Sequence, residues 1–99
     1  MNTLSVKQIQ YLKGLAHNLS PVVMIGDKGL TKTVLNEIET SLKAHELIKI
    51  RVFGEDRELR REMIEEICQK TLAIPVQQIG KLLVIYRPSD QNKIIIPAK

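Results

Sequence analysis

A short segment, Gly26-Asp27-Lys28-Gly29, has residue types suited to binding an anion. It follows the apolar residues 22–25 and precedes an amphipathic helical pattern that starts near Thr31. Glycine lacks a Cβ atom, so the backbone N–H groups around it can approach a ligand closely. A helix N-terminus adds unpaired N–H donors and about half a positive charge. Because Lys28 and Lys32 add full charges, we hypothesise that this glycine loop (residues 26–29) binds the phosphates of a polyanion.

Three interpretations of the glycine loop compete. In the first, the glycines only provide the backbone geometry of a tight turn between a strand and a helix. The second is a mononucleotide phosphate loop, which needs four residues between its glycines and a Lys-Ser/Thr pair after the second. Leu30 follows Gly29 instead, and only two residues separate the glycines. The third is a clamp for a nucleic-acid backbone, as in KH domains, where a Gly-x-x-Gly loop beside a helix start holds several nucleotides.

The charges around the loop favour the third interpretation. Lys28 lies inside the loop, and further cations lie just beyond it or on predicted strands that could be its neighbours: Lys32, Lys49, Arg51, Lys81 and Arg87. Asp27 is the exception, because a carboxylate repels phosphate. We expect its side chain to cap the following turn.

Three predicted helices would support the loop. The first starts at a capping box formed by Ser5 and Gln8, the second at the N-cap Thr31, and the third at the N-cap Asp56. Their predicted apolar faces contain Ile9, Leu12, Leu15, Ala16 and Leu19; Val34, Leu35, Ile38 and Leu42; and Leu59, Met63, Ile64, Ile67, Cys68 and Leu72. The acids of the third helix are spaced to pair with Arg57, Arg60 and Arg61, which predicts a solvated, salt-bridged face.

Four predicted strands complete the domain. Residues 22–25 form the first, and residues 47–53 alternate, with Ile48, Ile50 and Val52 on one face and Lys49, Arg51 and Phe53 on the other. Residues 75–79 and 81–87 form an antiparallel pair around Gly80. The order α-β-α-β-α-β-β predicts a two- to three-layer α/β domain with a four-stranded mixed sheet, and it leaves the strand order open. Residues 93–99 form a tail whose isoleucines either dock on the sheet or add an edge strand.

Composition indicates one soluble domain over residues 1–99. The net charge is +4, yet residues 55–66 carry six acids and three arginines, so the rest of the chain carries +7. A domain with one acidic element and an otherwise basic surface can turn a defined side toward a polyanion. With Cys68 as the single cysteine, no internal disulfide can form, and no segment resembles a signal peptide or a membrane span. We therefore expect a cytoplasmic protein with no membrane contact.

Four segments together form a specific pattern over nearly the whole chain: Leu12-Lys13-Gly14-Leu15-Ala16-His17, Pro21-Val22-Val23-Met24-Ile25-Gly26-Asp27-Lys28-Gly29-Leu30-Thr31, His45-Glu46-Leu47-Ile48-Lys49-Ile50-Arg51-Val52 and Ile79-Gly80-Lys81-Leu82-Leu83-Val84-Ile85-Tyr86-Arg87-Pro88. The pattern closely resembles the bacterial YhbY-type CRM family, named for chloroplast RNA splicing and ribosome maturation. Many relatives have a neutral or basic residue at the position of Asp27.

The resemblance implies a fold like the C-terminal domain of bacterial translation initiation factor three. It also implies RNA binding linked to assembly of the large ribosomal subunit. In the family, the Gly-x-x-Gly loop and nearby basic residues are taken as the RNA surface. Carried over to this sequence, the RNA-binding residues are Gly26, Asp27, Lys28, Gly29, Lys32, Lys49 and Arg51, with Lys13 and Arg87 as further members.

Other residues suggest no chemistry of their own. Cys68 lies in an apolar stripe and is predicted to be an inert core residue. His17 and His45 lack the spacing of a metal site or of a nucleophile and its base, so we expect no metal, no cofactor and no enzymatic activity. Tyr11, Phe53 and Tyr86 are too few for a base-stacking platform of the RRM type. Recognition should therefore depend mostly on phosphates and sugars.

Two hypotheses remain. The leading one is a monomeric RNA-binding module that joins precursor large ribosomal subunits through 23S rRNA. The alternative is a small protein-interaction adaptor that reaches ribosomal particles through protein contacts on its helices. RNA titration with charge-reversed loop variants separates the two.

Overall fold

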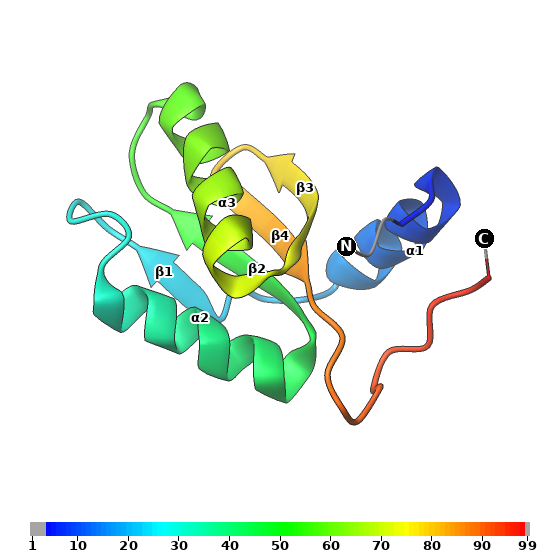
Figure 1. The fold of residues 1–99 in the computed structure, drawn as a ribbon. Coiled ribbons are helices and arrows are strands. Elements are labelled where there is room, and N and C mark those ends of the chain that lie inside the picture. The colour runs from blue at the N-terminus through cyan, green and yellow to red at the C-terminus, as the bar shows by residue number, and fades with distance from the viewer. Residues whose placement is uncertain (1–3, 99) are drawn as a thin grey trace.

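The computed structural model describes residues 4–98 and has the predicted order of three helices and four strands (Figure 1). The elements are α1 (Val6–Ala16), β1 (Val23–Ile25), α2 (Lys32–His45), β2 (Leu47–Val52), α3 (Arg57–Thr71), β3 (Ile74–Ile79) and β4 (Leu82–Tyr86). The predicted α/β fold with a four-stranded mixed sheet is confirmed. Within residues 4–98, no helix combines the length and apolar character needed to cross a membrane.

All three predicted N-caps are confirmed. The Ser5 hydroxyl accepts from the Gln8 N–H at 3.2 Å, and the Gln8 side chain accepts in return from the Ser5 N–H at 2.9 Å. Thr31 caps α2 by accepting from the Val34 N–H, and the Asp56 carboxylate caps α3 by accepting from the Leu59 N–H. Each cap stabilises its helix by about 1 kcal/mol. The Thr31 cap fixes where α2 begins, directly after the glycine loop.

The sheet has the strand order β1-β2-β4-β3. β1 and β2 are parallel, as expected for strands joined by a helix, while β2–β4 and β4–β3 are antiparallel. The chain therefore crosses from β2 through α3 to the far edge, and β4 then returns to fill the centre. The central strand β4 is buried along nearly its whole length, which matches its continuous apolar sequence, whereas β2 alternates between buried apolar residues and the more exposed Lys49 and Arg51.

Each face of the sheet has its own core. On one face, α2 and α3 cover the larger core, which includes Ile48, Ile50 and Val52 from β2. On the other face, α1 covers a smaller core that includes Leu12, Leu47, Val84 and Tyr86. Figure 1 shows α2 and α3 together over the sheet, with α1 displaced toward the opposite end of the molecule. Because α1 lies toward one end of the sheet, it covers only part of its face (Figure 1).

The C-terminal tail docks on the domain without forming a strand. Ile94 and Ile96 pack against the smaller core, and Pro97 accepts a hydrogen bond from the Gln8 side chain at 2.9 Å. The buried Glu46, whose φ is 68°, anchors the same segment. Its carboxylate accepts from the backbone N–H groups of Ser89, Lys93 and Ile94 and from the Ser89 hydroxyl.

Several side-chain predictions for α3 are wrong. Leu59 and Leu72 are exposed, because Leu59 lies in the first turn and Leu72 caps the helix with a left-handed φ of 65°. Arg60 is buried and donates to the Gly54 carbonyl at 3.0 Å, so it does not belong to the solvated face. Cys68 packs partly buried against the larger core, as predicted, and burial raises the pKa of its thiol to about 11.

Candidate nucleic-acid interface

The glycine loop is an exposed turn between β1 and α2. The Gly29 N–H donates to the Gly26 carbonyl at 3.0 Å, and Gly29 has a φ of +69°. This left-handed backbone conformation is the one that glycine tolerates without strain. A Cβ at Gly26 or Gly29 would meet no atom within 4 Å, so the space over both glycines is open.

Backbone donors around the loop are free to bind a ligand. In the described part of the chain, the N–H groups of Asp27 and Lys28 donate to no protein acceptor, and the same holds for Lys32 and Thr33 in the first turn of α2. The side chains of Lys28 and Lys32 are exposed. The turn therefore presents donors and two cations at the positive end of a helix dipole.

Asp27 does not have the role that we expected. Thr31 caps α2, and the exposed carboxylate of Asp27 accepts no hydrogen bond from residues 4–98. Asp27 therefore leaves one negative charge beside Lys28.

A second basic area lies on the part of the sheet that α1 leaves uncovered. Alternation along β2 places Leu47 under α1 and carries Lys49 and Arg51 onto the open part of the same face. Lys13 of α1 and the C-cap residue His17 line a hollow of about 310 Å³ together with Lys49. The structure thus brings the predicted residues Lys13 and Lys49 together, and Arg51 continues their row toward the end of β1, where the glycine loop begins. We call this row of Lys13, Lys49 and Arg51 the open face.

Arg87 lies elsewhere and is removed from the candidate interface. It follows Tyr86, which packs under α1, so alternation turns Arg87 to the other face of the sheet. There its guanidinium donates to both carboxylate oxygens of Glu39 at 2.8 Å and to the Thr71 carbonyl at 2.9 Å. The hydrogen bonds from Arg87 hold the pKa of Glu39 below its ordinary value, although burial opposes them. Arg87 therefore joins β4 to α2 and α3.

The sequence interpretation missed three residues near the open face. Met24 pairs in register with Arg51 and is 56% exposed, His17 lines the hollow beside Lys49, and Phe53 is 48% exposed at the end of β2. The alternation of β2 already placed Phe53 on the face of Lys49 and Arg51. Three aromatic residues are too few for a stacking platform of the RRM type, so this position of Phe53 does not by itself predict a role in binding.

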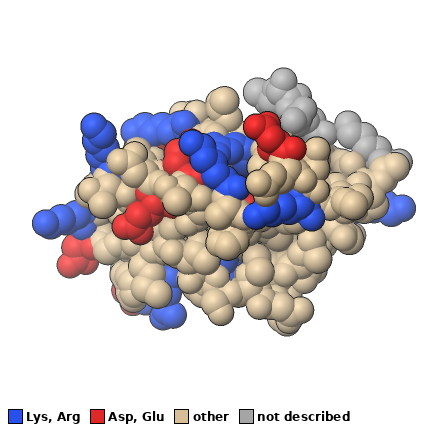
Figure 2. All heavy atoms as spheres, turned by 90° about the horizontal axis from the view of Figure 1, so that it is seen from below, with Lys and Arg blue, Asp and Glu red and all other residues tan. Residues whose placement is uncertain are grey.

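The face of the molecule seen in Figure 2 is mixed in character. Figure 2 shows Lys and Arg side chains interspersed with Asp and Glu, and no continuous basic field on this face.

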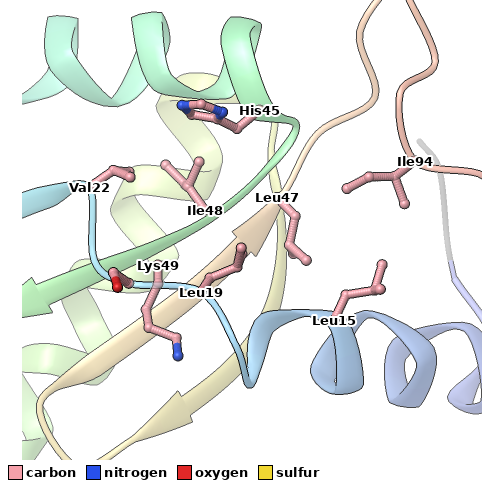
Figure 3. A pocket seen from close by; sticks show the side chains of 9 residues that line it. Leu15, Leu19, Val22, His45, Leu47, Ile48, Lys49 and Ile94 are labelled. Carbon is pink, nitrogen blue, oxygen red and sulfur yellow. The ribbon is translucent and has the colours of Figure 1, made fainter.

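At the C-terminal end of α2, an apolar groove of about 480 Å³ opens between α1, β2 and the tail (Figure 3). Its walls include Leu15, Leu19, Val22, Leu47 and Ile94, and Lys49 lies at its edge. Among residues 4–98, no group of three or more His, Cys, Asp or Glu side chains could hold a metal ion.

Comparisons with known proteins show what this chain is similar to. The family model described as the CRS1/YhbY (CRM) domain matches residues 4–87. An RNA-binding protein of Haemophilus influenzae is 57% identical over 99 residues, which are 100% of both chains. A protein of Pseudomonas aeruginosa named as a probable RNA-binding protein is 38% identical over 88 residues, covering 89% of this chain and 85% of its own. The solution structure of a hypothetical Staphylococcus aureus protein, described as a candidate RNA-binding protein, has a TM-score of 0.85 and 38% identity, covering 96% of this chain and 100% of its own.

Proposed function

Since the chain belongs to the CRS1/YhbY (CRM) domain family, we propose that it is a cytoplasmic, monomeric RNA-binding protein that acts on 23S rRNA in precursor large ribosomal subunits. The role is binding that assists assembly, without catalysis. Relatives named as RNA-binding or probable RNA-binding proteins support the class of ligand. The choice of precursor ribosomal particles follows from the family resemblance.

The observation that carries this proposal is the exposed glycine loop, with its free N–H groups and its two lysines, next to the open face. Backbone N–H groups and lysines suit phosphate oxygens, which fix the position of an RNA without reading its sequence. Five cations are available: Lys13, Lys28, Lys32, Lys49 and Arg51. If each neutralises one phosphate of a single strand, the slope of log affinity against log salt is about −3.5.

Charge reversal at the loop tests the proposal. The Lys28→Glu/Lys32→Glu variant should lose affinity for structured 23S rRNA fragments by on the order of 100-fold at low salt, because two attractions become repulsions. The matched control is Arg57→Glu/Arg61→Glu, which changes the net charge equally on the acidic helix α3. Equal affinity losses for the two variants would mean that net charge, and not the loop, governs binding.

The apolar groove favours one second candidate function, the adaptor that binds ribosomal particles through protein contacts. Leu15, Leu19 and Val22 leave apolar surface exposed there, and such surface often marks protein contacts. Leu19→Ser should abolish association with precursor particles if the adaptor is correct, and it should leave the binding of isolated RNA unchanged. Crosslinking in cells compares the RNA-binding function with the adaptor function directly, since our proposal predicts crosslinks from the open face to 23S rRNA.

A further inference from the structure

Phe53 lies directly beside the glycine loop, at the end of β2. Its backbone N–H donates to the carbonyl of Ile25, the residue before Gly26, at 2.9 Å. Adjacent strands are about 4.8 Å apart, so the backbone of Phe53 is about one strand spacing from the start of the loop. An RNA whose phosphates are bound at the loop can therefore bring a neighbouring base to this ring.

The Phe53 ring belongs to neither core. It is 48% exposed, whereas the preceding Val52 is 3% exposed and packs in the larger core. A single exposed apolar side chain is ordinary on a protein surface. Here, however, the exposed ring lies next to the free N–H donors of the glycine loop and to the cations of the open face. Its position, and not its exposure alone, suggests a ligand.

Arg51 and Met24 complete a small patch around the ring. The Arg51 guanidinium carbon lies 5.4 Å from the centroid of the Phe53 ring, within the range of a cation–π interaction. Met24 is the cross-strand partner of Arg51 and is 56% exposed. Aromatic rings and arginine planes are the groups on which proteins stack unpaired RNA bases. The patch therefore offers a base a flat apolar surface, with a cation at hand for its phosphate.

We infer that Phe53 is a stacking site for one unpaired nucleobase of an RNA whose backbone is bound at the glycine loop, with Arg51 orienting the ring. This inference rests on the proposed function and adds a base contact to an interface otherwise made of phosphate contacts. Every base has a π face, so stacking tolerates sequence. The site selects unpaired nucleotides over paired ones.

A tryptophan reporter tests the contact directly. The chain contains no tryptophan, so Phe53→Trp places a single indole at the site. A short single-stranded RNA should quench the fluorescence of this indole on binding, because a base stacks on it. Inorganic polyphosphate carries similar charge without bases, so it should bind without quenching. Leu59→Trp, at an exposed position on the acidic helix α3, is the matched control and should show no quenching with either ligand.

Affinity measurements give the second test. Phe53→Leu keeps an apolar side chain without a ring and should lower RNA affinity roughly 5- to 150-fold. Its affinity for polyphosphate, its salt slope and its thermal midpoint should match the wild type, and Phe53→Tyr should bind RNA like the wild type. Unchanged RNA affinity of Phe53→Leu, or equal losses for RNA and polyphosphate, would overturn the stacking site alone. Failure of the wild-type protein to bind any RNA would overturn the proposed function together with it.

Discussion

The two ends of α2 treat their polar groups differently. At the N-terminal end, the backbone N–H groups of the glycine loop and the side chains of Lys28 and Lys32 are exposed to solvent. At the C-terminal end, the carboxylate of Glu46 is buried and accepts hydrogen bonds from the tail. The helix has 14 residues, so the two ends are about 21 Å apart. Figure 1 shows the loop and the tail at opposite ends of α2.

The two ends differ because water binds the polar groups at the N-terminal end, whereas protein groups form the hydrogen bonds at the C-terminal end. A buried carboxylate without donors is very unfavourable, so the Glu46 end must be complete before the fold is stable. Exposed N–H groups and ammonium groups cost little in water and remain available to a phosphate ligand. Backbone N–H groups therefore stabilise the fold at the C-terminal end of α2, and they can bind RNA at its N-terminal end. Substitutions should separate these two roles.

The largest expected effect on stability is at Glu46. Glu46→Ala removes the acceptor for the N–H groups of Ser89, Lys93 and Ile94 and should destabilise the domain by about 3 kcal/mol, since these partly buried donors lose their hydrogen bonds to a charged acceptor. Urea unfolding measures the loss. RNA affinity, measured below the unfolding transition, should stay within about threefold of wild type. A stable variant with lost RNA binding would place the interface at the wrong end of α2.

Arg87→Ala should have the next largest effect. It removes the bidentate ion pair with Glu39 and the hydrogen bond to the Thr71 carbonyl. The free energy of unfolding should fall by about 2 kcal/mol, because the Arg87 side chain is only 20% exposed. Its RNA affinity should fall less than that of Lys49→Ala, the matched removal of one cation from the open face. Both quantities come from parallel melts and titrations. If Arg87→Ala weakens RNA binding more than Lys49→Ala while remaining equally stable, Arg87 returns to the interface.

Acid should weaken the hydrogen bonds that the Glu46 carboxylate accepts. Burial alone would raise the pKa of Glu46, but the hydrogen bonds from Ser89, Ile94 and Lys93 together hold it below its ordinary value of 4.5. A group with a lowered folded-state pKa contributes stability that is present above the unfolded-state pKa and is lost as pH falls through the folded-state pKa. Wild-type stability should therefore decline below about pH 4.5, and the decline should be shallower in Glu46→Gln. Parallel pH profiles of the two proteins would contradict this assignment.

The glycines should show the smallest effects on stability and separate folding from binding. Gly29→Ala forces a side chain into a φ of +69° and should destabilise by about 1 kcal/mol. Gly26→Val fills open space without that strain, so it should leave the thermal midpoint unchanged and weaken RNA binding about fivefold by blocking close approach. Thermal melts beside binding curves check both variants. Unaltered RNA affinity in Gly26→Val would show that close backbone approach at Gly26 is not used.

Local patterns made much of the fold predictable. The caps at Ser5, Thr31 and Asp56 depend on residues three positions away, and the alternation of β2 depends on neighbours two positions away. Both kinds of signal are visible in a sequence, and both are confirmed. The same local reasoning places Lys49 and Arg51 on one face.

Features that depend on tertiary contacts were not predictable. The role of Glu46 depends on donors more than 40 positions away, and Arg87 contacts Glu39 only because β4 enters the sheet beside β2. Arg60 looks like one of several charged residues of α3, yet the carbonyl of Gly54 draws it into a buried position. A sequence shows charge and spacing, but tertiary contacts decide which charges stay free.

The central claim is that the glycine loop at the N-terminal end of α2 binds an RNA backbone. The most direct test compares the salt dependence of binding to a single-stranded RNA for the wild type and for Lys28→Glu/Lys32→Glu, with folding checked by thermal melts. We predict a wild-type slope near −3.5, a shallower slope in the variant by about 1.4, and unchanged melting. Equal slopes and equal affinities in two folded proteins would contradict the claim.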